Sequence, residues 1–574
     1  MRAAEPVDRR ARLRWGIALG AVLALALGLR VWGVKHGLPY AYNADENAHF
    51  VTRSIGLFGH DWDPRYYVNP PAYTYLAHIL LSLWFGGREG VTSSFAADPT
   101  EIWILTRVLA AVLGTLAVWL AYLAAARLLD RRVALLGAAI YSVSFLPVFY
   151  SKLALNDVPT LTGVGLALWG AAGVLRFGRM RDYVIAGLGL GLASATKYTG
   201  GIVLIPLVVA AAAQLGPSGR LVALRGLGIA LVVAAATFLA ANPYAILDHE
   251  AFWEGLQRQS QAAGDTSGKL GLEQDNGYLY YLWSFGWGLG WVPLVLAAGG
   301  AVWLWFRERR LFWVLATPVV VFVVFMGSQE RYFGRWLMPV FPFVCILAAY
   351  AALQLAALGG RFMPALRSTF VALAVIAVCE QGLVYSIHSG LVMSRDDTRN
   401  LARDWMVANV PLGDRIVLEP IVPGLWTQDI GNPSPFTRNG NRWAKFFVGK
   451  SLIDPTTGRA GVFVHVEDYE RALRPALVDS YERDGYCHVV VGSTQRGRAE
   501  AEPEQVPRAI AYYEELARRA DVVHEVSPYA EGEGPVKFNF DWTFDYYPRA
   551  FERPGPDITI YRLRGGKCST AIRR

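Results

Sequence analysis

The feature that most constrains this 574-residue chain is the series of long apolar runs in its first two-thirds. Examples are Trp15–Val34, Ile102–Ala126 and Ser368–Ile387. An apolar run of about 18 residues or more can cross a bilayer as a helix, and lipid cannot satisfy the backbone of an open strand. When the 184–213 run is counted as two short helices broken near Lys197, the sequence predicts about eleven transmembrane helices.

Composition and charge agree with a polytopic membrane protein. Hydrophobic residues make up 53% of the chain and charged residues only 18%, against about 25% charged in soluble globular proteins. These values exclude a disordered chain and a disulfide-rich scaffold, and they disfavour a purely soluble enzyme. The net charge of +8 does not indicate a nucleic-acid partner, because much of the Lys and Arg falls in short loops between apolar runs.

Those loops predict the orientation. The N-terminus carries Arg9, Arg10, Arg12 and Arg14, and basic loops are retained in the cytoplasm. Stepping through eleven helices then puts a basic cluster in every inner loop. We therefore expect an integral plasma-membrane protein with a cytoplasmic N-terminus, in which the first loop (35–100) and the C-terminal tail are extracytoplasmic.

Residues 389–574 differ from the apolar part, 1–388, and are expected to form a separate soluble α/β domain. The patterns Asp396–Asn409 and Val506–Arg519 are typical of amphipathic helices, and Arg415–Glu419 and His488–Gly492 of buried strands.

Two features of this tail leave alternatives open. Cys487 and Cys568 could form a disulfide. The aromatic stretch Phe538–Tyr547 could stack on sugar or acceptor rings, although a packed strand and interface anchor is slightly favoured.

The first outer loop carries the most suggestive chemistry. If a helix begins near Asp45, then Asp45, His49 and Arg53 share one face, and a carboxylate beside an imidazole suits general base catalysis. On spacing alone, the favoured alternative is that Asp45 and Glu46 stabilise a helix N-terminus.

Polar residues also recur on the other predicted outer turns. Each alone could be an interfacial or snorkelling residue. Together they place acids and bases at one depth, where they could hold the anionic head group of an outer-leaflet lipid. These residues are Lys152, Asn156, Asp157, Lys197, Tyr198, Glu330, Arg331, Tyr332 and Arg335.

Four short motifs within residues 45–342 resemble those of the GT-C glycosyltransferases, and most closely the protein O-mannosyltransferases and the aminoarabinose transferases that modify lipid A. The matching segments are Asp45-Glu46 with His49-Phe50 and Asn69-Pro70-Pro71, then Asn156-Asp157-Val158-Pro159, then the Thr196-Lys197 turn, and finally Arg331-Tyr332 with Pro339 and Pro342.

The resemblance implies a GT-C fold and an inverting glycosyl transfer from a polyprenyl-phosphate sugar. The acceptor would be a hydroxyl of a lipid, a glycan or a protein. Membrane lipids would be further partners. Asp45 would be the general base, and Glu46 would orient the acceptor or a metal. The carrier phosphate would be held by Lys197, Arg331, Tyr198 and Lys152. The cavity would be lined by His49, Arg53, Asn69, Asn156, Asp157, Glu330, Tyr332 and Arg335.

The chain departs from these families before the paired prolines, where Asn69 replaces the basic residue or histidine of the relatives. No cofactor is implied with certainty. A divalent cation is left open, with Asp61 and Asp63 as weak candidate ligands and a loop turn as the favoured alternative. The main rival class is a transporter or flippase of a lipid-linked or small anionic substrate, but no repeated halves are evident.

Overall fold

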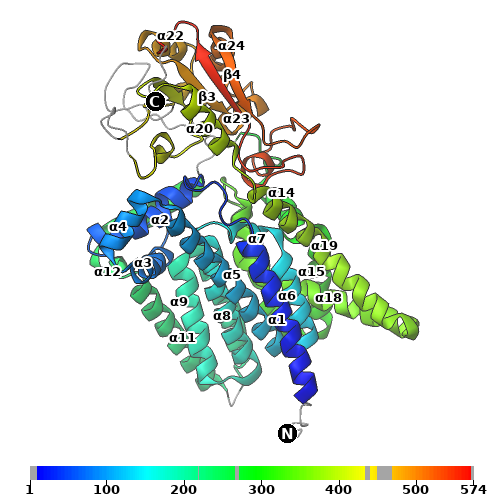
Figure 1. Cartoon of the computed structure of the whole chain (residues 1–574). Coiled ribbons are helices and arrows are strands. Elements are labelled where there is room, and N and C mark those ends of the chain that lie inside the picture. Colours follow the sequence, from blue (N-terminus) through cyan, green and yellow to red (C-terminus); the bar gives the residue numbers. More distant parts are fainter. Residues whose placement is uncertain (1–8, 217–218, 265–269, 433–439, 449–467, 570–574) are drawn as a thin grey trace.

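The computed structural model describes residues 9–216, 219–264, 270–432, 440–448 and 468–569. A helical bundle forms the lower part of Figure 1, and a smaller domain containing a sheet sits on one end of it. This arrangement confirms the predicted fold class, a polytopic helical protein with a C-terminal α/β part.

In the described residues, eight helical segments are long and apolar enough to cross a membrane. Three of the predicted spans fold instead as the shorter helices α6, α9 and α10, so the count of eleven remains a prediction. The bundle consists of α1 (Arg9–Val31), α5 (Thr100–Leu128), α6 (Arg131–Val143), α8 (Asp157–Phe177), α9 (Met180–Thr196), α10 (Leu204–Ala212), α11 (Arg220–Ala241), α14 (Gly277–Phe285), α15 (Trp291–Arg307), α16 (Arg309–Leu315), α17 (Thr317–Gly327), α18 (Phe341–Phe362) and α19 (Arg367–Met393).

Small residues let the central helices approach closely. α8 packs against both α5 and α9. A Cβ added to Gly170 on α8 would lie 2.3 Å from the backbone nitrogen of Ala186 on α9, so only glycine fits there. Such contacts between small residues are how helices associate in lipid, where no hydrophobic effect drives them together.

Short elements cover the end of the bundle that faces the sheet domain. The first long loop contains a π-helical turn (Glu46–Phe50), α2 (Val51–Gly56), α3 (Ala72–Phe85) and α4 (Arg88–Ala97). The other short elements at or near this end are α7 (Phe145–Tyr150), α12 (Tyr244–Leu247), α13 (His249–Ala263) and the 3-10 turns Tyr198–Val203 and Gly334–Val340.

The sheet domain has the strand order β2-β1-β3-β5-β4, in which β1 pairs in parallel with β2 and β3 while β5 runs antiparallel to β3 and β4. The two strands and two helices expected from the sequence are present as β1, β3, α20 and α24. The bounds are α20 (Thr398–Asn409), β1 (Arg415–Leu418), β2 (Ala444–Phe447), α21 (Tyr469–Ala472), α22 (Ala476–Arg483), β3 (His488–Gly492), α23 (Ser493–Ala501), α24 (Pro507–Arg519), β4 (Ala520–Val526) and β5 (Ile558–Leu563).

Two features of this domain resolve open alternatives. Cys487 and Cys568 form a disulfide. The aromatic stretch is not the predicted strand, because Trp542–Tyr546 forms a π-helical turn. It does anchor the domain to the bundle: the Tyr546 hydroxyl lies 3.1 Å from that of Tyr150, and Trp542 stacks on Phe145.

Candidate functional site

A cavity of about 310 Å³ lies where the bundle meets the sheet domain. Its walls come from the first loop, from the segment after α7, from the turn before α18 and from the sheet domain. The charged side chains that line it are Asp45, Arg331, Arg335, Arg399, Arg498 and Asp545, together with His36.

Asp45 is the predicted catalytic residue that lines this cavity. Its Oδ2 atom lies 2.7 Å from an Nη2 nitrogen of Arg335, and about a third of its side chain is exposed (35%). Burial alone would raise the pKa of this carboxyl, but Arg335, His49 and Lys197 lower it, and the net pKa is below the usual aspartate value. Asp45 is therefore ionised at neutral pH and accessible from the cavity.

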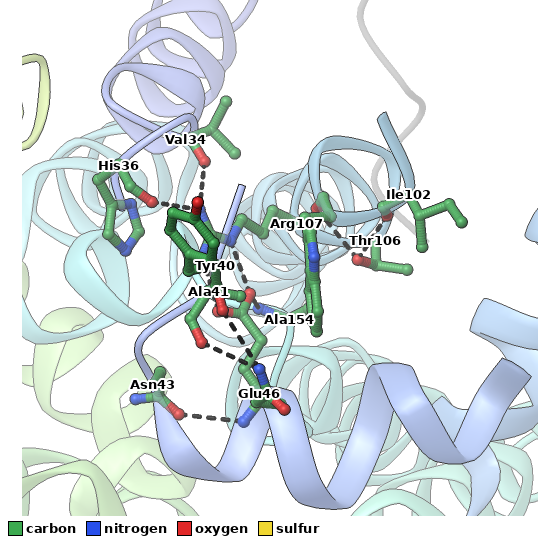
Figure 2. A network of polar contacts seen from close by, with 12 residues as sticks. Val34, His36, Tyr40, Ala41, Asn43, Glu46, Ile102, Thr106, Arg107 and Ala154 are labelled. Carbon is green, nitrogen blue, oxygen red and sulfur yellow. Dashed lines mark hydrogen bonds and ion pairs between the residues drawn. The ribbon is translucent and has the colours of Figure 1, made fainter. Parts of the chain in front are cut away.

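Asp45 and Glu46 lie at the N-terminal end of the π-helical turn, as the helix-cap alternative expected, but the Asp45 carboxylate makes no capping hydrogen bond to it. Instead, Oδ1 of Asn43 accepts a hydrogen bond of 3.1 Å from the backbone N–H of Glu46, as Figure 2 shows. The turn thus has a neutral side chain as its acceptor, and the Asp45 carboxylate remains available to the cavity.

Glu46 points away from this cavity into the protein interior. Both of its oxygens are held by Arg107, at 2.6 Å from Nε and 2.7 Å from Nη2, and Oε1 also accepts from the backbone N–H of Ala154 at 2.9 Å (Figure 2). Both side chains are fully buried. This geometry departs from the expectation that Glu46 orients the acceptor or a metal, because its carboxylate is already occupied.

Arg107 ties this pair to the segment that leads into the first loop. Its Nη1 atom donates to the carbonyl oxygens of Val34 at 2.7 Å and His36 at 2.9 Å (Figure 2). The pair therefore fixes the chain on the N-terminal side of Asp45 against α5. Sequence reasoning missed Arg107, although a charge inside the apolar run 102–126 was a usable signal.

Lys197 and Asp157 form an ion pair and are nearly buried. Asp157 begins α8, where a negative charge favours the helix N-terminus. Beside it, the Nδ2 atom of Asn156 donates to the carbonyl oxygen of Thr196 at 2.8 Å and lies 3.3 Å from Oδ1 of Asn69. The structure thus brings the three separate motifs of the first loop, the acidic turn and the Thr-Lys turn together.

The remaining first-loop residues gather around Tyr66. The ring of His49 stacks on that of Tyr66 with centroids 4.6 Å apart, and the Arg53 guanidinium lies 5.3 Å from the same ring. The shared face of His49 and Arg53 is therefore present. Asn69 does not line the cavity. Its Nδ2 atom donates a hydrogen bond to the Tyr66 hydroxyl at 3.0 Å.

Other predicted residues lie away from the cavity lining. Lys152 is fully buried and donates to Oγ of Ser389 at 3.1 Å. The hydroxyl of Tyr198 donates to the carbonyl oxygen of Tyr67 at 3.0 Å. The hydroxyl of Tyr332 donates to the backbone carbonyl oxygen of Asp275 at 2.9 Å. Glu330 is exposed outside the cavity, whereas its neighbour Arg331 lines it.

The candidate metal ligands do not reach the cavity. Oδ1 of Asp63 accepts hydrogen bonds from the Tyr67 hydroxyl at 2.6 Å and from the backbone N–H of Arg65 at 2.8 Å, as expected for a loop turn. Within the described residues, one cluster has ligand types and spacing suited to a metal, Asp414, Cys487 and His488. Because the Cys487 sulfur is bonded to Cys568, it offers no thiolate there.

The sheet domain supplies cavity residues that sequence reasoning missed. Arg399 stacks over Tyr42 at 3.7 Å and pairs with Asp397, and Arg498 lies over the rings of Phe540 and Phe544. These two arginines line the cavity because the sheet domain packs against the helical bundle. No local sequence pattern indicates that contact.

Comparison with known proteins supports the resemblance found in the motifs. Residues 102–244 match the family described as dolichyl-phosphate-mannose-protein mannosyltransferase. This segment runs from α5 to the start of α12 and includes the Asn156-Asp157 and Thr196-Lys197 turns. No curated protein sequence matches the chain.

The chain is similar to several solved structures at low identity. The oligosaccharyltransferase of Archaeoglobus fulgidus in the apo form is 15% identical with a TM-score of 0.53, and the match covers 93% of this chain and 76% of that one. The same organism's AglB in complex with an inhibitory peptide and a dolichol-phosphate is 14% identical with a TM-score of 0.50, covering 94% and 76%. ArnT from Cupriavidus metallidurans bound to undecaprenyl phosphate is 15% identical with a TM-score of 0.46, and the match covers 96% of this chain and 98% of that one.

The chain shares its fold with the archaeal oligosaccharyltransferase, and its segment 102–244 is similar to the mannosyltransferase family. Both findings support the resemblance to GT-C glycosyltransferases that the motifs predicted.

Proposed function

We propose that this protein is an inverting glycosyltransferase that moves a monosaccharide from a polyprenyl-phosphate carrier to an acceptor hydroxyl, with Asp45 as the general base. The observation that carries the proposal is an ionised, one-third exposed carboxylate in a cavity at one end of an apolar bundle, paired on one oxygen with Arg335. A lipid-borne donor can reach that end of the bundle from the bilayer, while a polar acceptor can reach it from water.

The chemistry assigns one event to each group. As the acceptor oxygen attacks the anomeric carbon, Asp45 takes its proton. The bond between the anomeric carbon and the phosphate oxygen breaks on the opposite face, which inverts the configuration and releases the polyprenyl phosphate. A carboxylate with a low pKa is ionised at neutral pH and can therefore accept a proton. The proton moves late in the reaction, because the acceptor hydroxyl becomes acidic only as its oxygen bonds to the anomeric carbon.

We assign the carrier phosphate to Lys197 and Arg331. Lys197 is near enough to Asp45 to lower the pKa of its carboxyl, and Arg331 lines the same cavity. Fixed cations beside the leaving phosphate stabilise the charge that develops as the bond breaks. A polyprenyl phosphate fits the fold, since the AglB structure that shares it was solved with dolichol-phosphate.

The geometry also revises the roles expected for other residues. We assign Glu46 and Lys152 to positioning, because both are fully buried and hydrogen-bonded inside the protein. Asn69, Asn156 and Asp157 hold the turn that carries Lys197. His49 and Arg53 shape the loop beside Asp45.

For topology, we propose that the cavity and the domain of residues 389–574 face the extracytoplasmic side. The basic loops of the sequence support this orientation. The transporter alternative has no particular observation in its favour, because the charged residues that line the cavity lie at one end of the bundle rather than at its midplane.

The experiment is mass spectrometry of lipid that copurifies with the protein, followed by use of that lipid as a donor with a panel of glycan, lipid and peptide acceptors. We expect a polyprenyl-phosphate monosaccharide whose sugar is transferred with inversion. A donor carrying a nucleotide, or retention of the anomeric configuration in the product, would contradict the proposal.

A further inference from the structure

Arg498 stands out among the cations of the cavity. It lies on α23 in the sheet domain, lines the cavity and is only 6% exposed. Its guanidinium carbon is 4.8 Å from the ring centroid of Phe540 and 4.9 Å from that of Phe544. Among the described residues, its Nε atom has no hydrogen-bond partner and no carboxylate forms an ion pair with it.

Two other arginines of the same cavity differ in this respect. Arg335 is paired with Asp45 at 2.7 Å, and Arg399 is held by both oxygens of Asp397 at 2.7 and 2.8 Å. A buried charge without a counter-ion is costly. Stacking on two phenyl rings repays part of this cost, but it provides no acceptor for the N–H groups at the edge of the guanidinium plane, and the buried Nε has none among the described residues. An anionic ligand would satisfy them.

A helix N-terminus adjoins Arg498. α23 is a nine-residue helix, and its first-turn residues Thr494 and Gln495 line the cavity with Arg498. The N-cap residue Gly492 has no side chain to cap this N-terminus. The N–H groups of Gly492 and Ser493 donate to Oε2 of Glu419 and to the carbonyl oxygen of Asp557, so the part of the first turn that faces the cavity is Thr494 and Gln495. The N-terminal end of a helix carries partial positive charge and backbone N–H groups that favour anions. Two independent features of the domain therefore indicate the same kind of ligand.

We propose that Arg498 and the first turn of α23 form a subsite for a phosphate or carboxylate group carried by the acceptor. The acceptors of this enzyme are then anionic glycans or anionic glycolipids, in which an acidic group binds to the sheet domain and positions a nearby hydroxyl for Asp45. A guanidinium suits both anions because its N–H groups match their paired oxygens.

This inference rests on the proposed function, which supplies the donor. It concerns a different group of the cavity, because the carrier phosphate is assigned to Lys197 and Arg331 of the helical bundle, whereas Arg498 belongs to the sheet domain. The C-terminal part of the chain also contributes Asp545 to the lining. A subsite of mixed charge favours an acceptor with both an acidic group and hydroxyls over a simple inorganic anion.

The test uses the full-length protein in lipid nanodiscs saturated with undecaprenyl phosphate, so that the carrier-phosphate site is occupied. Ligand-observed NMR titrations compare methyl β-glucuronide and glucose 6-phosphate with the neutral methyl β-glucoside. We expect the wild type to bind at least one acidic probe about tenfold more tightly than the neutral sugar, as befits charge-assisted hydrogen bonds.

Three variants locate that preference. Arg498→Gln should abolish the preference for the acidic probes. Arg498→Lys keeps the positive charge and should retain part of it, so the loss in Arg498→Gln can be assigned to charge rather than to misfolding. Arg496→Gln is the matched control: it lies on the same helix, pairs with Glu500 and does not line the cavity. It should leave the preference unchanged.

Several results would overturn the inference. These are a wild type without preference for either acidic probe, an unchanged preference in Arg498→Gln, or a loss of undecaprenyl-phosphate affinity in that variant, which would assign Arg498 to the donor. Failure of the proposed function looks different. The wild type would then not bind undecaprenyl phosphate, while an Arg498-dependent preference for acidic sugars would persist in nanodiscs without that lipid.

Discussion

Asp45 and Glu46 are neighbours in the sequence, and each is paired with an arginine, yet their surroundings are opposite. The Glu46–Arg107 pair is fully buried, and both carboxylate oxygens are occupied. In the Asp45–Arg335 pair, the arginine contacts one oxygen, and the aspartate side chain is about one-third exposed to a cavity.

We interpret the first as a structural ion pair and the second as a reactive one. Removing one partner from a fully buried pair leaves an uncompensated charge in a medium that cannot solvate it. An exposed carboxylate beside an arginine keeps its charge at neutral pH and can exchange protons with a substrate. We infer that Glu46 fixes the loop against α5 and against the segment that follows α7, and that Asp45, one residue earlier, performs the chemistry.

The largest expected effect is on catalysis at Asp45. Asp45→Asn keeps the shape of the side chain but cannot accept a proton. Transfer should fall by about 10²–10⁴-fold, with the melting temperature close to that of the wild type. A steady-state assay with the copurified donor measures the first quantity, and a thermal melt in detergent measures the second. Retained turnover would remove Asp45 from the mechanism.

Glu46→Gln should have the opposite effect to Asp45→Asn: folding stability falls while transfer by the folded protein is retained. It leaves the Arg107 charge buried without its counter-ion, which costs about 3–5 kcal/mol of folding stability. We expect a lower melting temperature and a poor yield of folded protein. The folded fraction should still transfer sugar.

The control for Glu46 is the double variant Glu46→Gln with Arg107→Met, which removes both charges and should recover much of the lost stability. If Glu46→Gln is as stable as the wild type but inactive, Glu46 belongs with the catalytic groups instead.

Arg335→Gln sharpens the comparison through pH. In the wild type the pKa of Asp45 is held below its usual value, since the effect of Arg335 and its other cationic neighbours outweighs burial. Without Arg335, the carboxylate loses the cation that lowers its pKa most, and the pKa rises. Since only the ionised carboxylate is active, the acidic limb of the kcat/KM profile should move to higher pH.

Arg331→Gln is the matched variant for this profile. It removes another cavity arginine, one that is not among the main causes of the pKa shift of Asp45. The position of its acidic limb should remain that of the wild type, even if donor binding weakens. Equal shifts in both variants would mean that general cavity charge, rather than the ion pair, sets the pKa.

The smallest expected effect is on donor affinity. Lys197→Ala should weaken undecaprenyl-phosphate binding by about tenfold, the worth of one charge-assisted hydrogen bond. Asp157→Asn breaks the same ion pair but keeps the lysine charge, so its affinity should be retained or increased. Fluorescence titration in nanodiscs measures both. Equal losses in the two variants would assign Lys197 a structural role only.

Much of the fold follows from the sequence because lipid leaves few choices. Apolar runs such as 102–126 and 368–387 become α5 and α19, and the buried strand patterns of the tail become β1 and β3. The count of spans is less secure, since α6, α9 and α10 are shorter than a bilayer crossing requires and depend on packing for their position.

The site could be predicted only in part. The motifs and the polar outer turns located Asp45, Lys197 and Arg335 at one end of the bundle. They also placed Glu46 at the substrate, because nothing near it in the sequence indicates its partner Arg107, which is 61 residues away. Arg498 was beyond reach for a different reason: it enters the cavity through the docking of a whole domain.

The most direct test of the account measures Asp45→Asn and Glu46→Gln in one transfer assay, with each rate divided by the amount of folded protein that binds undecaprenyl phosphate. We predict that Glu46→Gln stays within about tenfold of the wild type by this measure, while Asp45→Asn loses at least about a hundredfold. Equal losses, or the reverse order, would contradict the assignment of Asp45 as the base and Glu46 as its structural support.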